Sequence, residues 1–461
     1  MLQLDPDSRQ SLTEQLVDGV IAKIERGVLG EGARLPSVRG LAQSAGVSPF
    51  TVAEAYNRLV AAGWIASQRA RGYFVAAHRS KPAATPERAP VDDAWLLQRV
   101  YEDGGLDLPA GCGWLPHDWL YEDGVRAALR ALARAPAAML TRYGHPQGLP
   151  TLREHLQWRL ALRGIEAPAE RIVLTHGASQ GLDLAMRLLV KPGDTVLVEA
   201  PGYSTLLAAL TAHGARLAAV PRGAKGPDVA TLAKLAATHK PVAFFTNSAL
   251  HNPTGTTTSA MVAHQVLKLA EQFDFRVIED DPFADLLPGA SPTLASLDGL
   301  QRVIYLGSFS KTMSPALRVG YLAADTATAA RAAQLKMTGG LTSSELMEAA
   351  ALTMLSDGHH RSHLERLRER LADAQTRVCD KLGALGWSIP HRPGGGLFLW
   401  AEAPAGLDAG QLTDAAAHAG IALAPGRFYL PAGEGSRYFR FNAAWADNSR
   451  LYDWLASQGR P

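Results

Sequence analysis

The chain has 461 residues, of which 47% are hydrophobic and 20% charged, and its formal net charge is +2. These values are ordinary for a globular protein of about two to four domains. The near-neutral charge excludes a chain that binds polyanions along its whole length, and no apolar run is long enough to span a bilayer. Cys112 and Cys379 fit no metal or disulfide spacing, so we expect a reduced, cytoplasmic setting and no metal site.

The N-terminal part of the chain has the pattern of a small helical domain. Ser11 and Glu14 form a capping box in front of an amphipathic helix. Ser37 caps a second, shorter helix that ends at Gly46, and Ser48 caps a third. Two short helices joined by a tight glycine turn are typical of a helix-turn-helix.

A small hairpin follows the third helix, with strands at Trp64–Ala66 and Tyr73–Val75 and with Arg69 and Arg71 near its tip. Residues 26–80 contain seven arginines and two glutamates, which is a local charge of +5. This excess fits contact with phosphates, although a solvated basic surface explains the charge alone equally well. The helix pattern and the charge together place a DNA-binding domain in residues 1–78.

Residues 79–93 form the expected linker. Pro82, Pro86 and Pro90 lie there among alanine, threonine and charged residues, and no periodicity survives. A proline-rich stretch of this length is a semi-rigid spacer that spans at most ~45 Å.

From about residue 171, predicted strands alternate with predicted helices. The strands are Arg171–Thr175, Thr195–Glu199, Val242–Asn247, Arg276–Glu279 and Arg302–Leu306, with helices at Ala178–Val190 and Thr205–His213. This alternation predicts a parallel-rich α/β sheet that binds ligands at the carboxyl ends of its strands. From about residue 328 the pattern is helical, and short strands at Leu397–Trp400 and Tyr438–Phe441 indicate a smaller α+β lobe.

Three of the strand-to-helix loops carry residues that suit a phosphorylated aromatic ligand. The first loop leads into a helix whose N-terminus can hold a phosphate, at Gly177, Ala178 and Ser179. Tyr203 follows the next strand, where its ring can stack on a heteroaromatic group, and Asn252 can donate to a phenolate oxygen. Taken singly, each of these features is explained equally well as a turn or as packing.

Two further strand ends carry ionisable side chains. A carboxylate at Asp280 can keep a pyridine nitrogen protonated, and Asp281 is the competing candidate. Lys311, once buried, can lose its proton and condense with an aldehyde. The residues that can complete a phosphate cup beside this lysine are Ser308, Ser310 and Arg318.

In chain order these strand ends offer a phosphate cup, a ring stacker, a phenolate donor, a pyridinium partner and a lysine. From about Leu106 onward the chain resembles the class I/II aminotransferases among fold-type I pyridoxal phosphate enzymes. The resemblance implies pyridoxal phosphate bound to Lys311 as a Schiff base, in an α/β body at 94–461. That body would have a large lobe at about 140–330 and a small lobe at about 94–139 and 331–461.

The same resemblance gives two more residues a role. Arg440, in Tyr438-Phe439-Arg440-Phe441, matches the arginine that grips a substrate or effector carboxylate. Tyr143, in Arg142-Tyr143-Gly144, matches a tyrosine that reaches the cofactor phosphate of the partner subunit. Both matches imply a homodimer with sites at the subunit interface.

The N-terminal domain resembles a GntR-type winged helix-turn-helix of α+β class, through Gly32–Arg39, Gly46–Ser48, Thr51-Val52 and Ala55-Tyr56. The order of head, linker and body resembles the MocR family of bacterial transcription regulators. This resemblance implies contact with double-stranded operator DNA through Arg34, Ser37, Arg39, Ser48, Phe50, Thr51, Tyr56, Arg69 and Arg71.

The chain departs from these families at two points. Pro282 and Phe283 occupy the stretch where aminotransferases place a tyrosine that bonds the phenolate of the ring, so we expect slow chemistry beyond the aldimine. The third helix begins Ser48-Pro49-Phe50-Thr51, where GntR proteins usually have an arginine after the serine. The second departure removes one contact with a phosphate or a base.

The combined motifs favour a pyridoxal phosphate-dependent regulator that senses an amino acid or amine through aldimine exchange at Lys311. The alternative is a competent aminotransferase with an auxiliary N-terminal domain, against which Arg39 and Thr51 argue. A DNA-binding protein with an inert body is disfavoured, because every cofactor anchor except the tyrosine is present.

His359 and His363 have the helical spacing of a metal pair, but no third ligand pattern accompanies them, so we predict a surface helix there.

Overall fold

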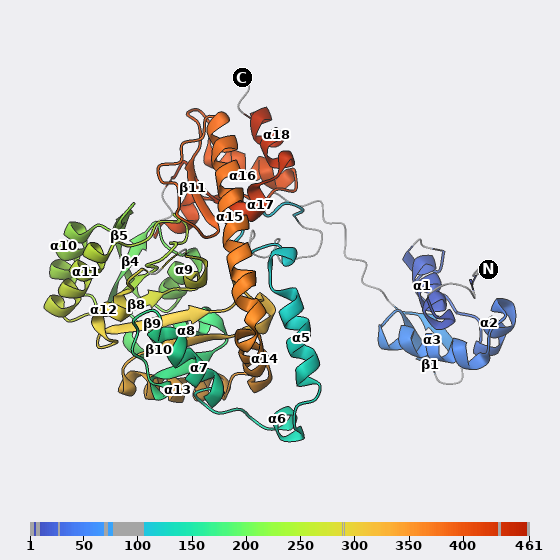
Figure 1. The fold of residues 1–461 in the computed structure, drawn as a ribbon. Helices are drawn as coiled ribbons and strands as arrows, with labels where there is room; N and C mark the ends of the chain where they lie inside the picture. The colour runs from blue at the N-terminus through green and yellow to red at the C-terminus, as the bar shows by residue number, and fades with distance from the viewer. Residues whose placement is uncertain are drawn as a thin grey trace. The chain divides into compact units, whose positions relative to one another are not determined.

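The computed structural model describes residues 4–5, 10–25, 28–68, 72–76, 106–287, 289, 291–431 and 435–458. The chain divides into two compact units, residues 1–90 and 91–461, which we call the head and the body (Figure 1). The predicted linker at 79–93 lies outside the described residues, as do Arg69 and Arg71. Among the described helices, none combines the length and the apolar character that crossing a bilayer requires.

The head is a helix-turn-helix followed by a hairpin, as the sequence predicts. Its elements are α1 (Leu12–Glu25), α2 (Val38–Ala45), α3 (Pro49–Ala61), β1 (Ile65–Gln68) and β2 (Gly72–Val75). The hairpin is antiparallel, with Ile65 opposite Val75. Leu16 of α1, Leu41 of α2 and Leu59 of α3 are buried and join the three helices in one core.

The caps of the head helices are those that the sequence predicts. The backbone N–H of Ser11 donates to the Glu14 carboxylate at 2.9 Å, which closes the capping box of α1. Ser37 accepts from the N–H of Gly40 at 3.1 Å, and Ser48 accepts from the N–H of Thr51 at 3.0 Å. These bonds satisfy N–H groups that the first turn of a helix leaves without partners.

The large lobe of the body is built on a mixed sheet of eight strands in the order β3-β10-β9-β8-β7-β4-β5-β6. The strands are β3 (Ile172–Thr175), β4 (Thr195–Ala200), β5 (Arg216–Gly223), β6 (Gly226–Pro227), β7 (Ala243–Thr246), β8 (Arg276–Asp280), β9 (Val303–Ser308) and β10 (Gly320–Ala323). The central strands are parallel, whereas β10 is antiparallel to both of its neighbours. As a result, Gly320 at the start of β10 lies opposite both Thr175 and Ser308.

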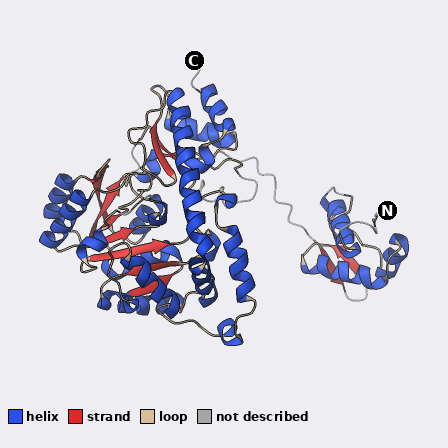
Figure 2. Ribbon diagram, in the orientation of Figure 1, coloured by secondary structure: helices blue, strands red, loops and turns tan. Residues whose placement is uncertain are grey.

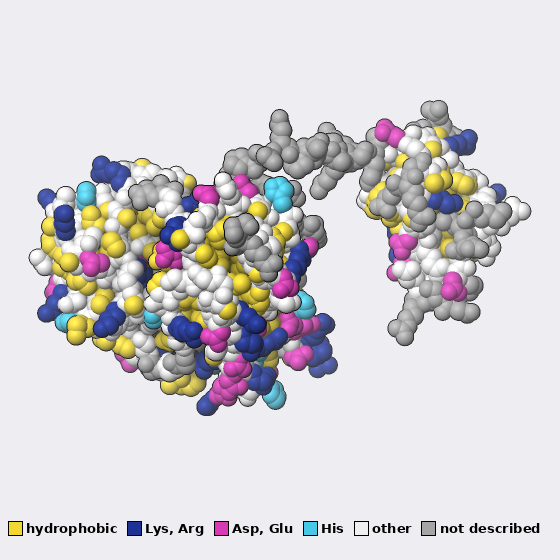
Figure 3. Space-filling view, turned by 90° about the horizontal axis from the view of Figure 1, so that it is seen from above, with side chains coloured by type: hydrophobic (Ala, Val, Ile, Leu, Met, Phe, Trp, Pro, Cys, Tyr) yellow, Lys and Arg dark blue, Asp and Glu magenta, His cyan; other side chains and the backbone are white. Residues whose placement is uncertain are grey.

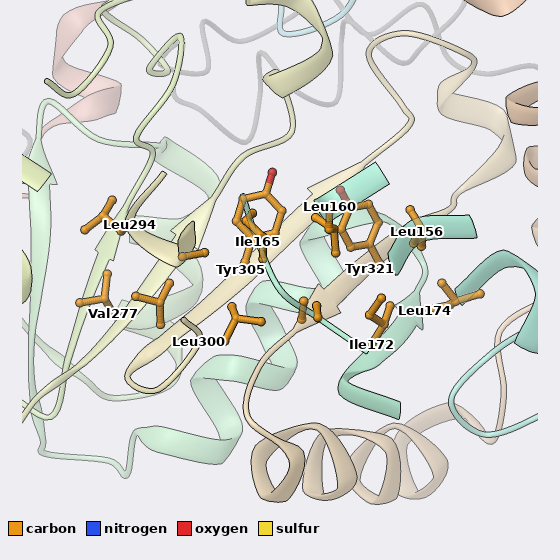
Figure 4. Close-up of a cluster of buried hydrophobic side chains, with 14 of the residues drawn as sticks. Leu156, Leu160, Ile165, Ile172, Leu174, Val277, Leu294, Leu300, Tyr305 and Tyr321 are labelled. Atoms are coloured by element: carbon orange, nitrogen blue, oxygen red, sulfur yellow. The ribbon is translucent and has the colours of Figure 1, made fainter. Parts of the chain in front are cut away.

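Helices cover both faces of this sheet (Figure 2). The helices of the large lobe are α5 (Glu122–Leu132), α6 (Ala137–Thr141), α7 (Pro150–Ala161), α8 (Gly177–Leu189), α9 (Ser204–Ala212), α10 (Val229–His239), α11 (Ala260–Phe273), α12 (Leu294–Asp298), α13 (Thr326–Gly340) and α14 (Glu345–Ser356). Successive side chains of a strand point to opposite faces of the sheet, so Val277 belongs to the buried cluster on one face and Ile278 to the cluster on the other. Figure 4 shows the first cluster, in which Tyr305 and Tyr321 pack with Leu156 and Leu160.

The small lobe has a three-stranded antiparallel sheet in the order β11-β13-β12. Its elements are α15 (Gly358–Ala384), β11 (Phe398–Glu402), α16 (Ala409–His418), β12 (Ala424–Pro425), β13 (Tyr438–Asn442), α17 (Ala443–Ala446) and α18 (Ser449–Gln458). Short 3-10 helices lie at His117–Trp119, Ala169–Arg171, Ala284–Leu286, Pro315–Leu317 and Gly426–Tyr429.

The boundary between the two lobes of the body differs from the one that the sequence predicts. Helices α5, α13 and α14 bury Ala128, Ala332 and Met354 in the clusters of the large lobe, not the small lobe. The helix predicted around His359 and His363 is present as part of α15, and His359 is exposed on it. His363 is not a surface residue, because its ring is buried, stacks on Tyr121 and lies 3.0 Å from the Thr312 carbonyl. In the described part of the chain no group of three or more potential ligands is arranged to hold a metal ion.

Candidate functional site

A pocket at the carboxyl edge of the large sheet is lined by both apolar and polar side chains. Val198, Phe245 and Ile278 line it from three adjacent strands, and Tyr203 and Asp280 also face it. The sequence predicts both of the latter residues as ring contacts, and the fold brings them to the same pocket. A flat heteroaromatic ring suits such a pocket, because apolar side chains bind its faces and a polar group can orient it.

Asp280 is one of several polar side chains that line this pocket. The residue is buried, and its Oδ1 has no hydrogen-bond partner among the described residues. Burial, reinforced by the neighbouring Asp281, raises the pKa of Asp280 to about 7. A protonated ring nitrogen placed here would satisfy the oxygen and stabilise the carboxylate, so Asp280 fits a pyridinium partner.

Asp281 faces a different part of the structure. Its Oδ2 accepts from the Tyr305 hydroxyl at 2.9 Å, and it lines a separate polar cavity with Arg163 and Asp285. Adjacent residues at a strand end point to opposite faces, so only one of the two carboxyl groups can face the ring pocket. Of the two candidates left open by the sequence, the geometry favours Asp280.

The predicted phosphate residues converge where β3, β9 and β10 meet. Gly177, Ala178 and Ser179 form the first turn of α8, whose free N–H groups suit an anion. Ser308 donates from its Oγ to the Oγ of Ser310 at 3.2 Å. Arg318 donates to the carbonyl of His176 at 3.0 Å, and a Cβ at Gly177 would lie 3.0 Å from its guanidinium. Because Gly177 also has a φ of +73°, the close approach depends on glycine at this position.

Lys311 lies between the ring pocket and the small lobe. Its Nζ donates to the carbonyl of Gly113 at 2.7 Å. Burial lowers the pKa of Lys311 to about 8, and the nearby Arg440 acts in the same direction, while Cys112 and Asp280 oppose the shift. A substantial fraction of a lysine with this pKa is neutral near physiological pH, which is the form that attacks an aldehyde.

Arg440, on β13, is held so that part of its guanidinium stays available. Its Nε and one terminal nitrogen donate to the Gly111 carbonyl at 3.1 and 2.6 Å, and the other terminal nitrogen donates to Asn252 Oδ1 at 2.7 Å. Among the described residues, one N–H on each terminal nitrogen then has no partner. A Cβ at Gly113 would lie 3.8 Å from this guanidinium, so the open end faces a residue without a side chain. Two parallel N–H groups suit a carboxylate.

Tyr143 and Phe283 complete the set of predicted body residues. The structure brings no other predicted cofactor residue against Tyr143, whose side chain is 78% exposed in the single chain. Phe283 is buried and packs edge-on against Phe398 at 5.3 Å between ring centroids. The position that carries a tyrosine in aminotransferases therefore serves packing here.

Behind Asn252 lies a buried ion-paired network that the sequence analysis missed. Arg222 pairs with Glu199 and donates through its Nε to Thr256 Oγ1 at 2.8 Å. Glu199 also accepts from the N–H of Asn247 at 3.0 Å, and Asn247 Oδ1 accepts from the N–H of Asn252 at 2.7 Å. The network fixes the loop that carries Asn252. Its signal in the sequence is a glutamate inside an otherwise apolar strand.

The segment Gly111–Trp114, which we call the strap, was also missed. Its carbonyl groups contact both Arg440 and Lys311, through Gly111 and Gly113. Asn442 Nδ2 and Trp445 Nε1 donate to the Trp114 carbonyl at 2.7 and 3.0 Å. Because these contacts use backbone carbonyl groups, the side chains of the strap give no signal for them.

In the head, the side chains predicted to contact DNA differ in exposure. Arg34, Ser37, Arg39, Ser48 and Phe50 are exposed, and Thr51 is half-buried. Tyr56 is fully buried, and its hydroxyl donates to the Pro36 carbonyl at 2.9 Å. This geometry contradicts a direct DNA contact for Tyr56, whose side chain instead fixes the chain in front of α2.

On the body, Figure 3 shows acidic and basic side chains interspersed on the face that it presents. The described residues of that face therefore form no continuous basic surface of the kind that binds nucleic acid.

Comparison with known proteins gives two family matches. Residues 117–452 match the model described as aminotransferase class I and II, and residues 12–75 match the bacterial regulatory proteins of the gntR family. The HTH-type transcriptional regulator YdcR of Escherichia coli (strain K12), itself uncharacterized, is 31% identical over 450 residues, which cover 94% of this chain and 95% of that protein. The HTH-type transcriptional regulator TauR of Rhodobacter capsulatus is 31% identical, over 95% of this chain and 93% of that protein.

A solved structure extends the comparison to the body. LysN, the alpha-aminoadipate aminotransferase of Thermus thermophilus, was crystallised with N-(5'-phosphopyridoxyl)-L-leucine. It superposes with a TM-score of 0.70 at 26% identity, covering 79% of this chain and 96% of that chain.

Proposed function

The chain belongs to the MocR-type transcriptional regulators, with a GntR head and an aminotransferase class I and II body, and we propose that it senses an amino acid or amine through pyridoxal phosphate held at Lys311. The observation that carries the proposal is the buried, unpartnered Oδ1 of Asp280, which faces the same pocket as Tyr203. A buried carboxylate without a partner is costly, and a pyridinium group would remove that cost.

When bound, pyridoxal phosphate supplies an aldehyde that amines attack and a ring that withdraws electrons. The remaining work falls to residues of this chain. Gly177 and Arg318 would hold the phosphate, Asp280 would face the ring nitrogen and keep it protonated, and Lys311 would present its neutral amine to the aldehyde. An incoming amino compound competes with that amine, and Arg440 binds its carboxylate through two N–H groups.

Phe283 favours sensing over turnover. Its buried ring packs on Phe398 and offers no hydroxyl to the phenolate oxygen, so amino-group transfer lacks one source of stabilisation. We therefore expect transaminase activity to be weak. The body then regulates the head, whose exposed Arg34 and Arg39 contact operator DNA. Arg69 and Arg71, which lie outside the described residues, are proposed to contact it too.

The strap supplies a route from the ligand to the linker. Lys311 and Arg440, the two residues that an amino compound would engage, are bonded to the carbonyl groups of Gly113 and Gly111. Upstream of the strap the chain leads to the linker at 79–93 and then to the head. Binding energy at the site can therefore bias the arrangement of two heads in a homodimer.

The experiment is reduction of the protein, incubated with pyridoxal phosphate, by borohydride, followed by peptide mass spectrometry. We expect the phosphopyridoxyl group on Lys311, and none at this position in Lys311→Ala. Attachment to another lysine of the wild-type pocket would overturn the assignment.

A second measurement tests sensing itself. Operator DNA selected from a random duplex library is titrated with the protein in the presence of the common amino acids and simple amines. At least one of them should change the DNA affinity of wild type, and Arg440→Ala should need a higher concentration of the same amino acid. An unchanged response in Arg440→Ala would contradict the role of this arginine as the carboxylate anchor.

A further inference from the structure

The outer face of α3 begins with a large apolar side chain. Phe50 is 80% exposed, more than any other large apolar side chain among the described residues. The buried side of the same helix consists of Val52, Ala55, Tyr56 and Leu59. Phe50 thus lies away from the core of the head, and packing within the head does not explain an aromatic residue there.

The first turn of α3 holds Phe50 in a fixed place. Pro49 occupies the first helical position, and Ser48 caps the helix by accepting from the N–H of Thr51 at 3.0 Å. The hydroxyls of Ser48 and Thr51 also bond to each other, at 2.7 Å. Since these two hydroxyls are engaged in the cap, Phe50 is the side chain of this turn that is best placed to meet a partner.

The neighbourhood of Phe50 suits DNA. The N-terminal residues of the second helix of a helix-turn-helix are those that meet base edges in the major groove. Arg34 and Arg39 of the head are exposed and, among the described residues, pair with no carboxylate, so they are available to phosphates. One turn along α3, Glu54 pairs with Arg58 at 3.2 Å, which offsets the negative charge that would repel DNA.

A phenyl ring cannot form hydrogen bonds with base edges. The 5-methyl group of thymine is the apolar group that the major groove presents. We propose that Phe50 packs against this methyl group and makes one position of each operator half-site specific for thymine. The inference rests on the proposed function, since it requires that α3 enters the major groove of an operator.

The experiment uses the full-length protein and an operator selected from a random duplex library. Each thymine of the selected sequence is replaced in turn by uracil, which removes only the methyl group. Wild type should lose about five- to tenfold in affinity at one thymine per half-site, the range of a single good base contact. Phe50→Ala should bind the thymine and the uracil operators alike, whereas Phe50→Leu, which keeps an apolar contact, should keep part of the preference.

Val60→Ala is the matched control, because Val60 is exposed on the same helix but far from its first turn. This variant should show the wild-type preference for thymine. Equal loss at uracil in wild type and Phe50→Ala would overturn the inference, as would equal weakening by Phe50→Ala on operator and random DNA. If the wild-type protein selects no sequence at all, the proposed function fails before the methyl contact is tested.

Discussion

Burial sets the chemistry of the ionisable side chains at the edge of the large sheet. Asp280 and Asp281 are neighbours in the chain and each has a buried Oδ1 without a hydrogen-bond partner among the described residues. They differ in surroundings, because Asp280 lines the ring pocket, whereas Asp281 lines a separate cavity and accepts from Tyr305 through its Oδ2. Lys311 is surrounded by groups of both signs, and desolvation is the largest influence on it. Because desolvation disfavours the charged form, the amine of Lys311 loses its proton more easily than the amine of a solvated lysine.

The lowered pKa of Lys311 predicts a pH dependence. Its neutral amine is the reactive form, so the rate at which pyridoxal phosphate attaches to the cofactor-free protein should rise with pH and level off near the pKa of about 8. A solvated lysine would gain rate up to about pH 10.4. Stopped-flow absorbance between pH 6 and 10 measures this profile, with Nα-acetyl-lysine as the unburied reference. A profile that rises in parallel with the reference up to pH 10 would contradict the burial argument.

Tyr56 shows where residue types alone mislead. Its position within a motif of the GntR type suggested a DNA contact, but in the folded head its ring is fully buried and lies 4.7 Å from the ring of Tyr73. A sequence motif identifies the residue type at a position, but it does not tell whether the side chain is buried or exposed. Phe50, six positions earlier, shows the reverse, because its apolar side chain is exposed whereas the side chain of Tyr56 is buried.

At the scale of elements, the sequence predicts those parts that repeat a local pattern. The helix caps at Ser37 and Ser48 and the parallel strands β4, β7, β8 and β9 follow from spacing within a short window. Strands β5 and β10 were missed, because their sequences, RLAAVPRG and GYLA, contain glycine, alanine or proline, which are depleted in strands. The strap could not be predicted either, since its carbonyl groups bond to side chains more than 190 positions away.

The strap yields a prediction at this scale. Trp445→Phe removes the N–H that bonds the Trp114 carbonyl and keeps most of the packing. A lost hydrogen bond of this kind costs about 0.5–1.5 kcal/mol, which loosens the strap without unfolding the body. We expect unchanged attachment of pyridoxal phosphate and a smaller effect of the effector on operator affinity.

Trp158→Phe, on an exposed part of α7, is the matched control and should respond as wild type does. Band shifts at fixed salt, with and without the effector, provide the comparison. A full wild-type response in Trp445→Phe would show that the signal does not pass through this hydrogen bond.

At the scale of the whole molecule, the combination of units determines which function is proposed. The body alone would indicate an aminotransferase, as the likeness to LysN does. The head alone would indicate a regulator with an unknown input. Their presence in one chain, together with Phe283 in the position of the usual tyrosine, supports the proposal that ligand binding to the body regulates DNA binding by the head.

Tyr143 provides the test of the assembly, since its exposed ring is proposed to reach the phosphate site of a second copy. Loss of its hydroxyl should weaken cofactor binding roughly tenfold or more, the effect of one hydrogen bond to a charged group.

Tyr143→Ala and Lys311→Ala, each deficient alone, are coexpressed with different tags and purified as the mixed dimer. If the tyrosine acts across the interface, one site of that dimer has an intact Lys311 from one protomer and an intact Tyr143 from the other. We therefore expect half of the sites to bind pyridoxal phosphate with wild-type affinity. If both sites of the mixed dimer stay deficient, the tyrosine acts within its own chain; if no dimer can be isolated, the shared site is excluded.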